Sequence, residues 1–216
     1  MLLRGIDVSH FQGAIDWPQV ATSAVVFSFI KATEGAHIVD PLFKGNWVQC
    51  AAAGLTRGAY HFGRPGSDAQ AQAQLFFATV GALEPKDLPP ALDIETLDQC
   101  SPEEVLQWVL DFTAAADALF GRQTMIYTDD GFWQNLASLP GCEQLGTRAL
   151  WLADYVANPA VPEPWQAWSC WQYSDGSVNG GTPVPGVAGN VDQNWFQQSA
   201  FQALTTPQPT AGQGLS

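Results

Sequence analysis

The segment from residue 91 to residue 128 contains a complete strand–helix–strand unit. It opens with Ala91-Leu92-Asp93-Ile94-Glu95, a short β-rich run, and closes with a second such run at residues 124–128. The helix-length segment between them begins with Ser101-Pro102-Glu103-Glu104, which combines an N-cap serine, a proline at the first helical position and a capping-box glutamate. Strands joined by a helix are expected to be parallel, because the chain must cross the sheet before the next strand begins. The segment therefore predicts an α/β fold.

The same alternation extends in both directions from this unit. Strands are expected at residues 5–9, 24–32, 58–62, 91–95, 124–128, 149–155, 170–174 and 190–196, and helices at 41–53, 68–83 and 101–120. After Tyr155 the pattern changes, because the linkers 157–169 and 176–189 contain too many prolines and glycines for an ordinary helix. The predicted fold is a single modified TIM-like barrel of about five βα units, closed by a helix-poor segment of three strands.

Composition limits the class of protein. The chain has 216 residues with 8 Lys and Arg against 21 Asp and Glu, a formal net charge of −13, which argues against nucleic acid as a partner. With 46% hydrophobic and 13% charged residues, the chain can bury a full core. One barrel commonly occupies roughly 200–250 residues, so residues 1–204 are predicted to form a single domain. The uncharged residues 205–216 are predicted to form a flexible tail.

The N-terminus carries no recognisable export signal. The run Met1-Leu2-Leu3-Arg4-Gly5-Ile6-Asp7 reaches a carboxylate before the apolar centre of a signal peptide could form. No apolar run approaches the ~18–20 residues that a membrane helix needs. These features predict a protein that has no signal peptide, is made in the cytoplasm and does not insert into a membrane.

Cysteine and histidine spacing argues against a metal site. Cys50, Cys100, Cys142 and Cys170 form no CxxC pair, and the three histidines show no H-E-x-x-H spacing, so no metal or other cofactor is expected. Cys50 and Cys170 fall in an apolar helix and strand and are predicted to be buried thiols. Cys100 and Cys142 lie in loops, where they could form a disulfide or remain free.

Every predicted strand ends in polar or ionisable residues. In a parallel barrel the carboxyl ends of the strands surround one mouth, where active sites lie. The residues expected there are Asp7, Lys31, Glu34, Tyr60, His61, Asp93, Glu95, Tyr127, Asp154, Gln172 and Asp192. Six of them are acidic, although strand interiors disfavour Asp and Glu. The alternative is that these carboxylates are scattered over solvated loops.

The pair Asp93 and Glu95 indicates a specific chemistry. Residues two apart on a strand face the same way with their Cα atoms roughly 6–7 Å apart. Repulsion and partial desolvation should then raise the proton affinity of one carboxyl and leave an acid beside an anion. Cleavage of a glycosidic bond needs both. Taken alone, the D-x-E spacing also fits a solvated pair or a metal site.

The aromatic content favours a sugar ligand. The sequence contains nine Trp, and six of them, Trp133, Trp151, Trp165, Trp168, Trp171 and Trp195, lie near the late strands and their loops. The flat C–H faces of sugar rings stack on such side chains, so an acidic cleft lined by aromatics suits a glycan better than a phosphorylated ligand. The equally weighted alternative is that each of these tryptophans belongs to the hydrophobic core.

Taken in order, these motifs resemble glycoside hydrolase family 25, the Chalaropsis-type lysozymes. The resemblance spans about residues 4–201. It rests on Gly5-Ile6-Asp7-Val8-Ser9 with Phe11-Gln12-Gly13 and Ile15-Asp16-Trp17, Phe29-Ile30-Lys31-Ala32-Thr33-Glu34-Gly35, Gly58-Ala59-Tyr60-His61-Phe62, Leu92-Asp93-Ile94-Glu95, Trp151-Leu152-Ala153-Asp154-Tyr155, Trp171-Gln172-Tyr173 and Val191-Asp192-Gln193-Asn194. The fold of this family is a β/α barrel with fewer helices in its later part.

The resemblance implies a muramidase that hydrolyses the β-1,4 bond between N-acetylmuramic acid and N-acetylglucosamine in bacterial peptidoglycan, and so lyses cell walls. It implies that Glu95 is the general acid and Asp93 the second catalytic carboxylate, acting either as nucleophile or by orienting the 2-acetamido group of the substrate. Asp7 and Asp192 match the other carboxylates of the cleft. The substrate contacts are expected at Tyr60, Asp154, Tyr155, Gln172, Lys31 and Glu34.

Two other functions stay open at this stage. One is a chitinase-like hydrolase of N-acetylglucosamine polymers, which also uses carboxylates spaced by one residue. The other is a catalytically silent, glycan-binding barrel, against which the intact pair of carboxylates argues. The chain shows no wall-binding repeats and no signal peptide, which fits release through a holin or delivery by a dedicated secretion machine, and a monomer is expected.

Overall fold

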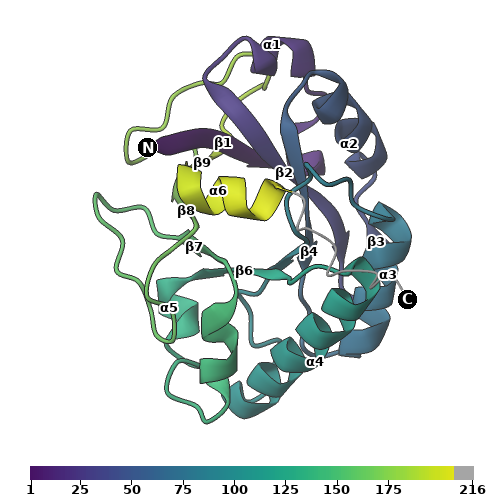
Figure 1. Cartoon of the computed structure of the whole chain (residues 1–216), viewed down its shortest axis with the longest axis vertical. Coiled ribbons are helices and arrows are strands. Elements are labelled where there is room, and N and C mark those ends of the chain that lie inside the picture. Colours follow the sequence, from purple (N-terminus) through teal and green to yellow (C-terminus); the bar gives the residue numbers. More distant parts are fainter. Residues whose placement is uncertain (207–216) are drawn as a thin grey trace, which may run out of the picture.

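Eight strands close into a barrel in the computed structural model, which describes residues 1–206 (Figure 1). They are β1 (Leu2–Val8), β2 (Val25–Glu34), β4 (Thr56–Phe62), β5 (Ala91–Asp93), β6 (Met125–Asp129), β7 (Leu150–Ala153), β8 (Cys170–Ser174) and β9 (Asp192–Gln197). Apart from the short extra strand β3 (Ile38–Val39) on the edge of β2, they follow one another in chain order, and β1 closes the barrel by pairing with both β2 and β9. The predicted barrel is confirmed.

The last barrel strand runs against its neighbours. Neighbouring barrel strands from β1 to β8, leaving out the edge strand β3, pair in parallel, whereas β9 is antiparallel to both β8 and β1. The expectation of parallel strands is therefore wrong for β9. The helix-free linker before β9 turns back at the same end of the barrel, and an antiparallel return needs no crossover helix. Asp192 begins β9 and pairs with Asp7 near the end of β1, so it reaches the mouth from the amino end of its strand.

Helices cover one side of the barrel more fully than the other (Figure 1). They are α1 (Trp17–Ala21), α2 (Phe43–Ala52), α3 (Ala69–Val80), α4 (Pro102–Phe120), α5 (Asp130–Trp133) and α6 (Gln198–Thr205), with short 3₁₀ helices η1 (His10–Gln12) and η2 (Cys142–Thr147). The predicted helices correspond to α2, α3 and α4, whereas α1, α5 and α6 were not expected. No helix separates β7, β8 and β9, in agreement with the composition of their linkers.

Helix α4 begins as its sequence predicts. Ser101 Oγ accepts from the backbone N–H of Glu104 at 3.2 Å, and Glu104 Oε2 accepts from the N–H of Ser101 at 2.7 Å. The capping box satisfies two of the free N–H groups at the helix N-terminus and fixes where α4 starts after β5. Among residues 1–206, no helix is both long and apolar enough to cross a membrane.

Side chains fill the interior of the barrel. Phe27, Phe29 and Trp151 form its centre, with the Phe29 and Trp151 rings stacked at a centroid distance of 4.1 Å. Gly5 and Gly58 make room for them, since a Cβ at Gly5 would lie 2.2 Å from the Phe27 ring and one at Gly58 would lie 2.5 Å from Phe29. The barrel is therefore a packed core, and a ligand can enter only at its mouth.

Helix α6 packs against this core through Phe201, whose ring centroid lies 5.8 Å from that of Phe27. The helix ends at Thr205, so this residue does not belong to the tail predicted to start there; residues 207–216 of that tail lie outside the described residues. All four cysteines are free, so Cys100 and Cys142 do not form the disulfide that the sequence left open. Cys50 and Cys170 are buried, as predicted.

Candidate active site

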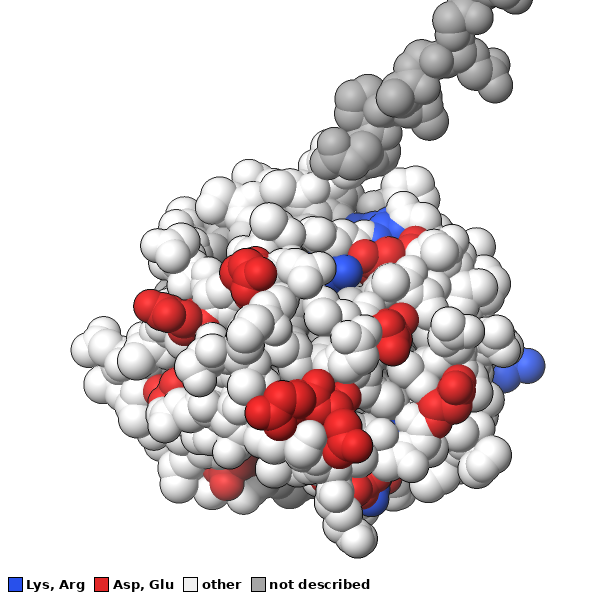
Figure 2. Space-filling view, turned by 90° about the horizontal axis from the view of Figure 1, so that it is seen from below, with Lys and Arg blue, Asp and Glu red and all other residues white. Residues whose placement is uncertain are grey.

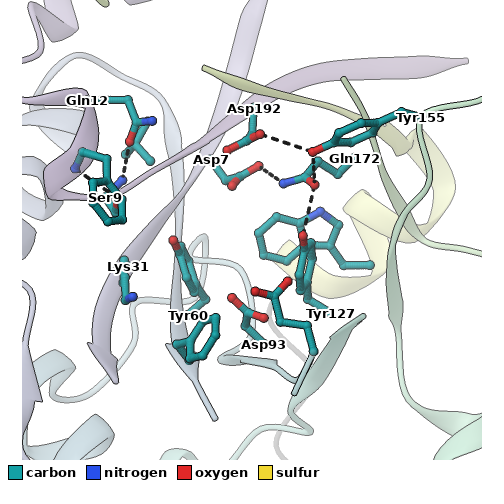
Figure 3. A pocket seen from close by; sticks show the side chains of 15 residues that line it. Asp7, Ser9, Gln12, Lys31, Tyr60, Asp93, Tyr127, Tyr155, Gln172 and Asp192 are labelled. Carbon is teal, nitrogen blue, oxygen red and sulfur yellow. Dashed lines mark hydrogen bonds between the residues drawn. The ribbon is translucent and has the colours of Figure 1, made fainter. Parts of the chain in front are cut away.

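A cavity at the mouth of the barrel gathers most of the predicted site residues (Figure 3). It is lined by Asp7, Val8, Ser9, Phe11, Gln12, Lys31, Tyr60, Phe62, Asp93, Glu95, Tyr127, Trp151, Tyr155, Gln172 and Asp192. Asp154 lines a neighbouring hollow that shares Glu95, Tyr127, Tyr155 and Gln172 with this cavity. Glu34 lines neither and lies beside Lys31. The acidic residues thus converge at one mouth and are not scattered over loops.

Asp93 and Glu95 follow one another at the end of β5. The intervening Ile94 is fully buried in the core, and its N–H continues the ladder by donating to the carbonyl of Tyr127 at 3.0 Å. The chain therefore stays extended, and both carboxylates face the cavity. Asp93 is buried, whereas Glu95 is exposed at the mouth. The two carboxyls thus share an orientation and differ in their access to solvent.

Both carboxyls hold protons more tightly than they would in water. Burial raises the pKa of Asp93 well above its usual range, and the charge of Glu95 raises it further, while Lys31 acts in the opposite direction. Partial burial raises the pKa of Glu95, and the nearby carboxylate of Asp129 adds to this effect. Asp93 Oδ1 is buried without a hydrogen-bond partner among residues 1–206, so nothing in the protein stabilises a negative charge on that oxygen.

A hydrogen-bond network holds the second pair of carboxylates (Figure 3). Asp7 Oδ2 accepts from Gln172 Nε2 at 3.0 Å and from Asn194 Nδ2 at 2.7 Å. Tyr155 Oη lies 3.5 Å from Asp192 Oδ1 and donates to Gln172 Oε1 at 3.0 Å. Burial and the charge of Asp192 raise the pKa of Asp7 well above its usual range, against the effect of its two amide donors. Burial and Asp175 raise the pKa of Asp192 to about 6.

Among residues 1–206, Lys31 is the only cation that lines the cavity. Its Nζ donates to Glu34 Oε2 at 2.7 Å and lies 4.9 Å from the centroid of the Phe62 ring. Arg64 forms an ion pair with the other carboxylate oxygen of Glu34, with Arg64 Nη1 3.6 Å from Glu34 Oε1. Glu34 therefore anchors the ammonium group from outside the cavity and does not itself line it.

Most of the late tryptophans belong to the core and not to the cleft. Trp133, Trp165 and Trp171 are buried, and each indole N–H donates to a backbone carbonyl, of Glu163, Arg148 and Asp154 respectively. The bond from Trp133 satisfies one carbonyl group of the proline-rich linker at residues 157–169, which has no helix of its own. Of the six tryptophans considered above, only Trp151 lines the cavity, whose aromatic walls are otherwise Tyr60, Tyr127, Tyr155, Phe62 and Phe11.

The structure brings further residues to the site that the sequence did not single out. Asp129 acts on Glu95, but the predicted strand stopped at Thr128, one residue before the true end of β6. Phe11 and Gln12 were noted only as a motif. His61, expected among the polar residues at the strand ends, is fully buried with its ring nitrogens paired to Thr33 and Gln72, and it does not line the cavity. Among residues 1–206, no three His, Cys, Asp or Glu side chains are grouped in a way that could hold a metal ion.

A barrel with four carboxylates and several aromatic rings at its mouth has the chemistry of a glycoside hydrolase. The model of glycosyl hydrolases family 25 matches residues 6–182 of this chain. The chain belongs to that family.

Named relatives agree with this assignment. Lysozyme M1 of Streptomyces globisporus is 36% identical over 219 residues, covering 97% of this chain and 72% of the relative. An N,O-diacetylmuramidase of Chalaropsis sp is 29% identical over 194 residues, covering 83% of this chain and 92% of the relative. The crystal structure of a bacterial lysozyme from Streptomyces coelicolor matches with a TM-score of 0.86 and 34% identity, covering 94% of this chain and 97% of that one.

Proposed function

We propose that this enzyme is a lysozyme that cleaves the β-1,4 bond between N-acetylmuramic acid and N-acetylglucosamine in bacterial peptidoglycan. The observation that carries the proposal is the pair of carboxylates at the end of β5, with exposed Glu95 beside buried Asp93 at the cavity. Membership of family 25 and the names of its lysozyme and muramidase relatives support the same substrate.

Glu95 is the general acid in this proposal. Its raised pKa keeps the carboxyl protonated to higher pH than a free glutamate, and its exposure lets it reach the glycosidic oxygen. Protonation of that oxygen by Glu95 lets the leaving sugar depart as an alcohol while positive charge builds at C1. The carboxylate formed on Glu95 then takes a proton from the water that attacks the sugar.

Asp93 is the second catalytic carboxylate. It either attacks C1 or accepts the N–H of the substrate's 2-acetamido group, whose carbonyl oxygen then acts as the internal nucleophile. The D-x-E spacing favours the second route.

The remaining residues at the mouth contact the substrate or alter the pKa values of the catalytic carboxyls. Asp192 lies close enough to raise the pKa of both Asp7 and Glu95. Tyr60, Tyr155, Gln172 and Lys31 line the cavity as substrate contacts. Asp154 contributes from the adjoining hollow, and Glu34 contributes through Lys31.

Substrate recognition is short-range in this proposal. Asp and Glu predominate over Lys and Arg on the face drawn in Figure 2, in keeping with the net charge of −13. Long-range attraction to an anionic wall is therefore not available, and binding depends on stacking and hydrogen bonds at the mouth. The site of action is the cell wall; delivery through a holin or a secretion machine, and a monomeric state, stay predictions from the sequence.

Replacement of the acid and analysis of the products test the proposal. Glu95→Gln should fold normally, because the residue is exposed, and should lose about 10²–10⁴-fold in turnover of purified cell walls. Glu103→Gln, on the exposed start of α4, is the matched control and should retain full activity. New reducing ends on muramic acid support a muramidase. Reducing ends on glucosamine, or better activity on plain chitin, would favour the chitinase-like alternative, and unchanged turnover by Glu95→Gln would overturn the assignment of the acid.

A further inference from the structure

Phe11 exposes an aromatic ring at the edge of the catalytic cavity. The residue is 80% exposed and still lines the cavity that contains Asp93 and Glu95. A single exposed apolar side chain is common in soluble proteins and needs no explanation on its own. Phe11 is unusual because its backbone and its neighbour His10 are held in place by hydrogen bonds while its ring stays exposed.

Helix η1 fixes the backbone of Phe11 from both ends. Ser9 Oγ accepts from the N–H of Phe11 at 3.2 Å, and Gln12 Oε1 accepts from the N–H of Ser9 at 2.8 Å. The helix ends at Gly13, whose φ of 63° lies in the left-handed region that glycine favours. This three-residue segment is therefore held in one conformation by its own capping box.

A buried carboxylate fixes the neighbour on which the Phe11 ring rests. The His10 ring lies 4.2 Å from that of Phe11, and both His10 N and His10 Nδ1 bond to Asp40 Oδ2, at 3.0 and 2.7 Å. Asp40 is 3% exposed and follows β3, so it ties η1 to a second element of the barrel rim. The aromatic surface is thus ordered in advance of any contact with a ligand.

The cavity has a second exposed aromatic side chain on its opposite side. Figure 3 shows Ser9 and Gln12, which flank Phe11 in the sequence, on one side of Asp7, and Tyr155 on the other. Tyr155 is 42% exposed and lines the same cavity. A polysaccharide that is cut in the middle extends in both directions from the cleaved bond, so it needs contacts on both sides of the carboxylates.

We propose that Phe11 is a stacking platform for a pyranose ring of the glycan strand, next to the sugars at the cleaved bond, and that it sets a preference for longer chains. This inference rests on the proposed function. The apolar face of a pyranose fits the free face of a phenyl ring. Gln12 Nε2 has no partner among residues 1–206, so it can donate to a ring hydroxyl at the edge of the platform.

A series of Phe11 variants on glycan strands of increasing length tests the platform. The substrates are soluble strands from peptidoglycan whose peptides have been removed. For Phe11→Ala we expect KM to rise about 3- to 10-fold on long strands with kcat little changed, because stacking contributes to binding and not to chemistry. The defect should shrink toward the shortest strand that is still cleaved. Phe11→Trp should restore KM, and Phe11→Leu, which is apolar but not flat, should not.

The controls separate this inference from the proposed function. The thermal midpoint of Phe11→Ala should match that of the wild type, because the ring is exposed. Val48→Ala, which removes an exposed apolar side chain from α2, should leave KM unchanged. Equal KM for Phe11→Ala and wild type on long strands, a length-independent defect, or full rescue by Phe11→Leu would overturn the platform. Failure of the wild type to cleave any strand would overturn the proposed function and the platform with it.

Discussion

The side-chain amide of Gln172 donates to a carboxylate oxygen of Asp7 at 3.0 Å across the mouth of the barrel. Its own oxygen accepts from the hydroxyls of Tyr127 and Tyr155, at 3.1 and 3.0 Å. Because both ends of the amide are used, its orientation is fixed. Gln172 therefore links the acidic centre of the mouth to two of its aromatic walls.

Gln172→Leu should damage both stability and activity. The substitution leaves Tyr127 without its acceptor and removes one of the two amide donors that lower the pKa of Asp7. An unpaired buried hydroxyl costs about 1–3 kcal/mol, and loss of position at the mouth should lower kcat/KM about 10- to 100-fold. Urea unfolding and steady-state kinetics on soluble glycan strands measure the two effects.

Gln49→Leu, on the exposed face of α2, is the control for this substitution and should change neither quantity. If Gln172→Leu loses stability but keeps wild-type kcat/KM, the network is structural and Asp7 is held well enough by Asn194 alone.

Asp129→Asn should move the alkaline limb of the pH–rate profile to lower pH. After burial, the charge of Asp129 is the largest influence that raises the pKa of Glu95, so its removal should let Glu95 lose its proton at lower pH. Asn also serves as an N-cap, so the bond that Asp129 Oδ1 accepts from the N–H of Phe132 at 2.8 Å should survive. Measurement of kcat/KM across pH checks the shift.

The adjacent Asp130→Asn provides the control for Asp129, because Asp130 acts on Asp154 and is not among the charges that act on Glu95. An equal alkaline-limb shift in both variants would point to a general change in surface charge and not to a specific effect on the acid.

Lys31→Met should move the pH–rate profile in the opposite direction from Asp129→Asn, to higher pH. The ammonium of Lys31 lowers the pKa of both Asp93 and Glu95, so its loss should raise both and move the whole profile to higher pH. Lys44→Met on α2 controls for the lost charge. A change in KM with no movement of the profile would show that Lys31 serves as a substrate contact only.

The polar ends of the strands made much of this site predictable from the sequence. A carboxylate such as Asp7 or Asp93 at the end of an apolar run stands out, because burial disfavours it unless function requires it. Once the barrel topology is inferred, the carboxyl ends of the parallel strands meet at one mouth, and the lining of the cavity by Asp7, Asp93 and Glu95 follows. Asp192 lies at the same mouth only because β9 is antiparallel and begins there.

Features that depend on tertiary packing were not predictable. The direction of β9 is set by a helix-free linker that turns back at one end of the barrel, and strand composition is the same in either direction. A tryptophan at the core and one at a cleft look alike in sequence, so Trp165 and Trp171 could not be assigned. The role of Phe11 depends on Asp40, which is distant in the chain and touches it only through His10.

Asp192→Asn should stabilise the protein at neutral pH and not in acid. The pKa of Asp192 is raised to about 6 from a usual value of 3.8, so the folded state favours its protonated form. The contribution of the Asp192 carboxyl to the free energy of unfolding is fully present below about pH 4. It is lost as the pH rises through about 6. An asparagine side chain does not ionise over this range, so its contribution to the free energy of unfolding does not change with pH.

The free energy of unfolding of Asp192→Asn should therefore equal that of the wild type near pH 4 and exceed it by about 3 kcal/mol above pH 7. Urea unfolding of both proteins at pH 4, 5, 6 and 7 gives this difference directly. Asp111→Asn, which makes the same change on the exposed face of α4, should show no such rise with pH.

Activity on cell walls should fall in Asp192→Asn as stability rises, because a carboxylate crowded against Asp7 is kept for its chemistry at the expense of stability. A difference that is constant from pH 4 to 7 would mean that Asp192 ionises as freely as an exposed aspartate, and that the charge of the mouth does not bear on its fold.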